Sequence, residues 1–120
     1  MNESAKFSVG THITADTETT ILTVPTGQTA ILTLVYMTNH TGADKTASVW
    51  WEHEHDTAHD IYMVDTKPFA TGDILNISDI EIVLKEGDKI KAQTQEGSDF
   101  SIILTFKLSD CYPLTFDYND

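Results

Sequence analysis

The sequence predicts an all-β protein: one domain folded as an antiparallel, jelly-roll-like β-sandwich with short terminal arms. Three observations carry this prediction. Apolar and polar residues alternate with a period of two along much of the chain, which is the pattern of half-buried strands. Turn-forming clusters rich in Gly, Pro, Asn and Asp separate these runs at regular spacing. The chain of 120 residues is also long enough to bury a core without disulfides or a metal.

The N-terminal part of the chain begins with residues that are polar and show no strong periodicity. We therefore expect an arm over residues 1–10 and the sandwich domain over residues 11–108. The first clear strand is expected at 19–25, and the next lies in "QTAILTLVYMTNH" at 28–40. This second segment is apolar on both faces, with one face formed by Ala30, Leu32, Leu34 and Tyr36 and the other by Ile31, Val35 and Met37. A strand of this kind indicates a contact with a partner, unless loops of the same chain cover its second face.

The later strands follow the same pattern. Strands are expected at "ASVWWEHE" (47–54), "DIYMV" (60–64) and "DKIKAQT" (88–94). The segment "DILNISDIEIVL" has an apolar spacing that a helix could also show, but its β-branched content favours strands. The clearest half-buried strand is 100–108, where Phe100, Ile102, Leu104, Phe106 and Leu108 share one face. The expected core consists of inward-facing apolar residues: Leu32, Leu34, Val49, Trp51, Ile82, Leu84, Ile102, Leu104 and Phe106.

The C-terminal extension, residues 109–120, mixes aromatic and acidic residues. Pro113 prevents it from continuing the preceding strand as regular pairing. Its side chains are too apolar for a solvated tail, because exposed apolar surface costs about 25 cal/mol per Å². We therefore expect Tyr112, Phe116 and Tyr118 to dock, with a neighbouring subunit favoured over the chain's own sheet.

The charge balance narrows the range of partners. Seven Lys, no Arg and nineteen acidic residues give a formal net charge of −12. Such a surface repels phosphate and has no guanidinium to read it, so nucleic acid is not expected as a partner. No apolar run is long enough to span a membrane, and no secretory signal begins the sequence. Cys111 is the only cysteine, which excludes an internal disulfide and a cysteine-based zinc cluster.

The segment "VWWEHEHDTAHD" at 49–60 contains three closely spaced histidines. On a strand, His53 and His55 would lie on the same face and could share a zinc ion, with His59 as a third ligand after a turn. The same His-x-His spacing occurs in cupin metal sites. The alternative is a strand end where the histidines meet solvent, and we adopt this structural interpretation, with no cofactor expected.

Catalytic motifs are lacking: there is no nucleophile elbow, no Gly-rich phosphate loop, and no identifiable pair of hydrolytic carboxylates. We therefore expect a protein without enzymatic activity. The other face of 47–54 would expose Trp50 beside Glu52 and Glu54. Because aromatic residues are enriched at the centres of interfaces, these three residues are predicted to form a contact.

Two longer stretches carry a resemblance to a known class of proteins. "TVPTGQTAILTLVYMTNHTGADKTASVWW" gives a Pro-x-Gly turn, a long apolar strand, an Asn-centred turn and a second strand, and "IVLKEGDKIKAQ" gives two strands around a Gly-Asp turn. Over about residues 19–108, this order resembles that of small β-sandwich virion structural proteins of tailed bacteriophages, of the capsid decoration (cement) type.

The resemblance implies a role based on packing. Proteins of this class clamp neighbouring capsomers together, often as a homotrimer, and contact the major capsid protein or other virion proteins. It also implies a location in the virion, after synthesis in the host cytoplasm. Two alternatives remain: a phage neck, collar or tail accessory protein, and a cupin-like metal-binding protein that uses His53, His55 and His59.

Overall fold

The computed structural model describes residues 5–14, 16–54 and 60–110. Within these residues the regular elements are nine strands: β1 (Ala5–Ile13), β2 (Thr19–Thr23), β3 (Gln28–Asn39), β4 (Lys45–Glu52), β5 (Ile61–Phe69), β6 (Ile74–Ile77), β7 (Ile82–Leu84), β8 (Lys89–Thr94) and β9 (Phe100–Asp110). Over the same residues, no helix is long and apolar enough to cross a membrane.

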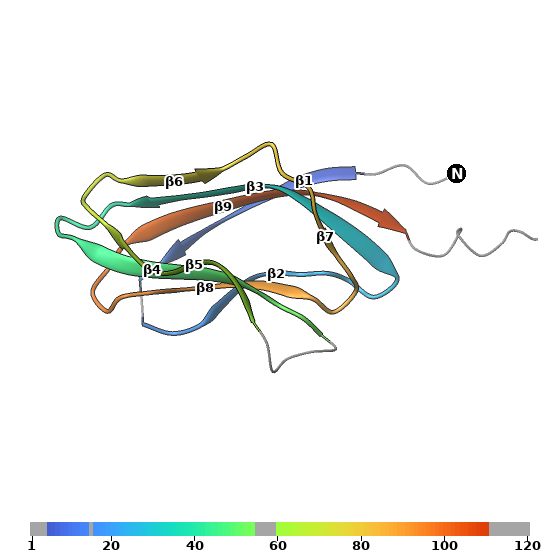
Figure 1. The fold of residues 1–120 in the computed structure, drawn as a ribbon, viewed down its shortest axis with the longest axis horizontal. Helices are drawn as coiled ribbons and strands as arrows, with labels where there is room; N and C mark the ends of the chain where they lie inside the picture. Colours follow the sequence, from blue (N-terminus) through green and yellow to red (C-terminus); the bar gives the residue numbers. More distant parts are fainter. Residues whose placement is uncertain (1–4, 15, 55–59, 111–120) are drawn as a thin grey trace, which may run out of the picture.

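The strands form two antiparallel sheets that pack face to face, which confirms the all-β sandwich (Figure 1). Sheet A has the order β1-β9-β3-β6, and β7 also pairs with β3. Sheet B has the order β2-β8-β4-β5. Most successive strands pass from one sheet to the other, an arrangement compatible with the jelly-roll-like connectivity that we expected.

The core lies between the sheets and consists of alternate residues from both. The largest of its fully buried side chains are Phe69, Phe100, Leu32, Met37, Leu84, Ile90, Ile102 and Leu104. The rings of Phe69 and Phe100 meet edge to face, with their centroids 5.3 Å apart. Eight of the nine predicted core residues are buried in this cluster or, like Trp51 and Ile82, packed against it. The exception is Leu34.

Leu34 was expected in the core because it alternates with Leu32, and this expectation is wrong. The pairing of β3 with β9 shifts register between Leu32 and Leu34, so that Thr33 is an extra residue in β3. An extra residue in one strand turns every later side chain to the opposite face. Leu32 therefore points inward, whereas beyond the bulge the inward residues are Val35 and Met37.

An N-terminal arm was expected over residues 1–10, and this expectation is wrong for residues 5–10. Residues 5–10 belong to β1, which pairs continuously with β9 from Ala5 opposite Leu108 to Ile13 opposite Phe100. The boundary expected between residues 10 and 11 thus falls inside a strand. Phe7 and Val9 do alternate with Lys6 and Ser8, but the run is short and most β1 side chains are exposed. The strand is held by its backbone pairing to β9. At the other end, β9 continues to Asp110, two residues beyond the expected limit of the domain.

The turn between β5 and β6 begins later than the segment "KPFATGD" at 67–73, with its Pro, Gly and Asp, would suggest. β5 continues through Pro68 to the buried Phe69. Proline is tolerated there because β5 is an edge strand of sheet B, where a missing N–H need not interrupt a ladder. The turn that follows is fixed by the buried Asn39, whose Nδ2 donates hydrogen bonds to the carbonyl oxygens of Ala43 and Phe69, both at 3.1 Å.

Candidate functional site

The outer face of sheet A is the first candidate site, and it carries large apolar side chains. The pairing registers place these residues on it: Lys6, Ser8, Gly10, His12, Ile31, Leu34, Tyr36, Thr38, Ile74, Asn76, Val83, Ser101, Ile103, Thr105 and Lys107. Ile74 is 56% exposed, Val83 53% and Ile103 39%. Exposed apolar side chains that share one face are typical of an interaction surface.

The charge of this face differs from that of the rest of the protein. None of the strand positions named above is Asp or Glu, although the chain has nineteen acidic residues. Lys6 and Lys107 lie directly opposite each other on β1 and β9. Like charges in this arrangement are destabilising unless an anion lies nearby. At one end of the face the Asp99 carboxylate lies 3.1 Å from His12, so it is the part around Lys6 and Lys107 that fits an acidic group of a partner.

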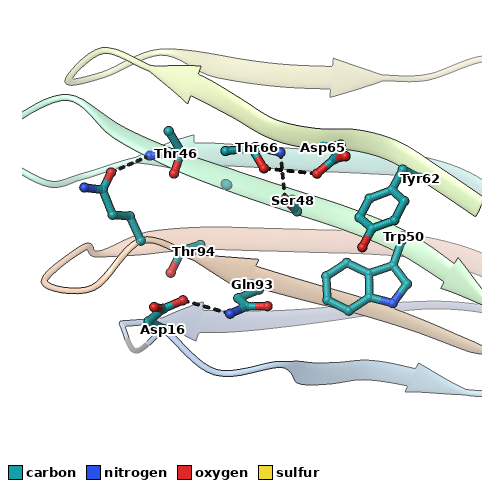
Figure 2. A pocket seen from close by; sticks show the side chains of 11 residues that line it. Asp16, Thr46, Ser48, Trp50, Tyr62, Asp65, Thr66, Gln93 and Thr94 are labelled. Carbon is teal, nitrogen blue, oxygen red and sulfur yellow. Dashed lines mark hydrogen bonds between the residues drawn. The ribbon is translucent and has the colours of Figure 1, made fainter. Parts of the chain in front are cut away.

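Sheet B carries the second candidate site, a groove of about 350 Å³ on its outer face. Figure 2 shows the groove running from Thr46 at one end to Tyr62 and Trp50 at the other. Its lining comes from β4, β5, β8 and the segment before β2: Asp16, Thr46, Ala47, Ser48, Trp50, Tyr62, Asp65, Thr66, Gln93, Thr94 and Gln95. We call this set the sheet B groove. No sequence motif marked it, because its residues come from four separate segments.

Trp50 was expected to be exposed, and the structure corrects this. Its side chain is only 2% exposed, because Tyr62 from the neighbouring strand pairs with it in register and lies over it, with ring centroids 5.4 Å apart. Tyr62 itself is 47% exposed, so it is the aromatic group that meets solvent here. Partial burial, and then the negative charges of Asp65, Asp60 and Glu18, raise the pKa of Tyr62 above its usual value.

The two glutamates predicted beside Trp50 have partners within the chain. The Glu52 carboxylate lies 3.0 Å from the Lys91 ammonium, which is also 3.5 Å from Glu18. The hydrogen bond to Glu52 is the main cause that raises the pKa of Lys91. Glu54 is held through its backbone N–H, which donates to Asp88. Trp50, Glu52 and Glu54 therefore do not form one exposed patch, and a contact at this place would be made through Tyr62.

The histidine cluster is only partly within the described residues, since His55 and His59 lie outside them. The His53 ring lies over the Trp51 indole at a centroid distance of 4.3 Å, and its Nε2 is buried without a hydrogen-bond partner. Residues 5–14, 16–54 and 60–110 contain no group of three His, Cys, Asp or Glu side chains that could hold a metal ion. Tyr112, Phe116 and Tyr118 also lie outside the described residues.

Asp88, in the Glu-Gly-Asp turn before β8, lies beside Trp51 and His53 and is only 5% exposed. Its carboxylate accepts hydrogen bonds from the backbone N–H groups of Lys85 and Glu54, both at 3.0 Å, and from Nε1 of Trp51 at 3.2 Å. The carboxylate thereby joins the β7–β8 turn to the end of β4. We assign Asp88 a structural role, which the sequence indicated only as a turn residue.

Comparison with known proteins adds information on the fold. The sequence matches no protein-family model and no curated protein. The structure is similar to a chain of the capsid of Helicobacter pylori bacteriophage KHP30, with a TM-score of 0.55 and 8% identity over 89% of this chain and 93% of that one. It is also similar to a chain of the disulfide-linked pili that form Bacillus endospore appendages, with a TM-score of 0.53 and 14% identity over 91% and 87% of the two chains.

A third similar structure is the Drosophila NLP core, described in connection with pentamer formation and histone binding. Its TM-score is 0.53, with 16% identity over 88% of this chain and 98% of that one. At identities this low, the three similarities establish a shared β-sandwich fold and leave function to be argued from the two sites.

Proposed function

We propose that this protein is a non-enzymatic structural component of a bacteriophage virion, and specifically a capsid decoration (cement) protein that stabilises contacts between capsomers. The observation that carries the proposal is the outer face of sheet A, which exposes Ile74, Val83 and Ile103 and has no Asp or Glu among its paired strand positions, on a chain with a net charge of −12. A protein that acts by attachment needs such a face. The sequence resemblance to virion proteins and the fold shared with a phage capsid chain both support this role.

The charges on this face also suggest how copies of the chain assemble. Two copies that paired through the strand positions of this face would bring no Asp or Glu of those strands to Lys6 and Lys107. A heterologous contact avoids this problem, because the face of one copy would lie on the acidic surface of the next. Heterologous contacts that close form rings, and we propose the smallest common ring, a homotrimer. The major capsid protein is the proposed second partner, with Tyr112, Phe116 and Tyr118 as further contacts.

Size measurement by light scattering tests the assembly. At micromolar concentration we expect a particle larger than the 13.4 kDa chain. The substitution Ile103→Glu should dissociate it, because it places a carboxylate in the middle of the apolar face. Ile61→Glu is the matched control: Ile61 is 49% exposed on β5 of the other sheet, and its substitution should leave the assembly unchanged.

If the isolated chain is a monomer, the same variants can be tested on virions. Attachment to capsids should be lost with Ile103→Glu and retained with Ile61→Glu. Deletion of residues 111–120, which leaves β9 complete, should weaken the same attachment without unfolding the domain. Equal attachment of all these variants would contradict the proposed contact, and label at the neck or tail in virion images would favour the accessory role over cement.

Metal analysis tests the cupin-like alternative. We expect the purified protein to hold no stoichiometric zinc, because the His53 ring is stacked on Trp51 at the edge of the sandwich. Zinc that copurifies at one ion per chain, and is lost in the His53→Ala, His55→Ala double variant, would establish the metal site. The Lys45→Ala variant, which removes a partly exposed cation at the opposite end of β4, is the control for nonspecific effects.

A further inference from the structure

We infer that the sheet B groove binds a neutral carbohydrate, with Tyr62 as the stacking platform and Asp16 and Asp65 as hydrogen-bond acceptors for sugar hydroxyls. This inference is independent of the proposed virion role, because it concerns the layer opposite the outer face of sheet A and is tested on the isolated protein.

The polar groups of the sheet B groove favour a neutral ligand with many hydroxyls. They comprise three hydroxyl side chains, two amides and two carboxylates: Thr46, Ser48, Thr66, Gln93, Gln95, Asp16 and Asp65; the hydroxyl of Thr94, which also lines the groove, is buried and bonded to Ser98. No Lys or Arg is among its described lining residues, so the groove offers an anionic ligand no ionic partner. Sugar hydroxyls both donate and accept, and hydrogen bonds from them to carboxylates are charge-assisted. The volume of the groove is within the range usual for small-molecule sites.

Each carboxylate accepts one side-chain hydrogen bond that favours a particular orientation. Asp16 Oδ1 accepts a hydrogen bond from Gln93 Nε2 at 2.8 Å, and Asp65 Oδ1 accepts one from Thr66 Oγ1 at 3.0 Å (Figure 2). Because these side chains are already oriented, less conformational entropy is lost when a ligand binds.

The aromatic pair at the end of the groove supplies the apolar contact that a sugar needs. A pyranose ring has a face of C–H groups that packs flat on an aromatic ring. Tyr62 offers such a ring, since it is half exposed and is supported from below by the buried Trp50. Tyrosine is rigid and gives a large contact area at low entropic cost. The position of Tyr62 at the groove, rather than at an isolated surface point, links stacking with the hydrogen-bonding groups.

The backbone at Thr66 shapes one wall of the groove. Thr66 has a φ of 52°, which is an outlier for a β-branched residue. Its backbone N–H donates to Ser48 Oγ at 2.7 Å, and the pairing of β4 with β5 shifts register on either side of Val49. Strained residues and bulges persist next to binding sites, where they aim side chains that regular pairing would turn away. Here they lie in the wall of the groove.

Binding of neutral oligosaccharides to the purified full-length chain tests the inference. The panel comprises glucans, mannans, galactans and N-acetylglucosamine oligomers, measured by calorimetry and by Trp fluorescence, since Trp50 lines the groove. We expect at least one of them to bind, and both Tyr62→Ala and Asp16→Asn to weaken it by about tenfold or more. Ile61→Ala, next to Tyr62 but outside the groove, should retain wild-type affinity. Thermal unfolding of each variant shows whether its fold is retained.

If Tyr62→Ala lowers stability as well as affinity, Asp16→Asn still tests the site, because it keeps the shape of the side chain and removes only the charged acceptor. The inference is overturned if no neutral saccharide binds at millimolar concentration. It is also overturned if binding occurs but is insensitive to Asp16→Asn. Binding of spermidine or a lysine-rich peptide in place of the saccharides would show that the two carboxylates serve a cationic ligand, and would equally refute the carbohydrate assignment.

Discussion

Replacing Leu32 with alanine is expected to lower the free energy of unfolding by about 2–5 kcal/mol, because it leaves a cavity in a core that cannot fully collapse. Leu32 is completely buried between the sheets, and it pairs with Phe106 on β9 and Ile82 on β7. Urea denaturation followed by circular dichroism measures the loss. Leu104→Ala, at an equally buried position on β9, is expected to cost a similar amount.

Leu34→Ala is the matched control for the bulge in β3. It removes the same atoms two residues away, but Leu34 points to the half-exposed outer face after the register shift. We expect a loss of about 1 kcal/mol or less, because little apolar surface is removed from the interior. Equal losses for the two variants, or a larger loss for Leu34→Ala, would show that the register shift at Thr33 is absent in solution.

The second large effect is expected for Asp88→Ala. The substitution removes an acceptor that satisfies three N–H groups, those of Lys85, Glu54 and the Trp51 indole. A buried donor left without a partner costs about 1–3 kcal/mol, and the alanine side chain cannot replace any of the three bonds. We therefore expect a loss of about 3 kcal/mol or more, measured as the shift in the urea midpoint at constant slope.

Two further variants make the Asp88 result interpretable. Asp44→Ala removes an exposed carboxylate in the β3–β4 turn, and its effect should remain within about 0.5 kcal/mol. Asp88→Asn retains one acceptor oxygen and should lie between Asp44→Ala and Asp88→Ala. If Asp88→Ala is as mild as the Asp44 control, the hydrogen bonds of Asp88 contribute no net stability and its structural role is refuted.

The sequence by itself determined the all-β class and the position of most strands. Period-two alternation identified β3, β4, β8 and β9, and the turn clusters separated them, because both signals are local. The same local pattern in β3 indicated apolar side chains on both of its faces. That observation led to the interface prediction. In the structure the outward side chains of β3 are Ile31 before the bulge and Leu34 and Tyr36 after it, and they belong to the outer face of sheet A.

The tertiary structure decided those features that depend on a partner strand distant in sequence. β1 is a strand because β9, almost a hundred residues later, supplies its hydrogen bonds, and the short alternation of Phe7 and Val9 with Lys6 and Ser8 did not identify this partner. The bulge at Thr33 arises where β3 meets β9, and it turns Leu34 outward and Val35 inward. Tyr62 covers Trp50 only because β4 and β5 pair in that register.

The sheet B groove is another feature that only the tertiary structure decided. Its polar groups lie on β4, β5 and β8 and before β2, and each looks like an ordinary surface residue within its own segment. A sequence pattern reports the two faces of one strand, whereas a groove is formed across strands, by the register in which they pair and by the bulges that shift it. The folded sheet alone brings Asp16, Asp65 and Tyr62 to one place.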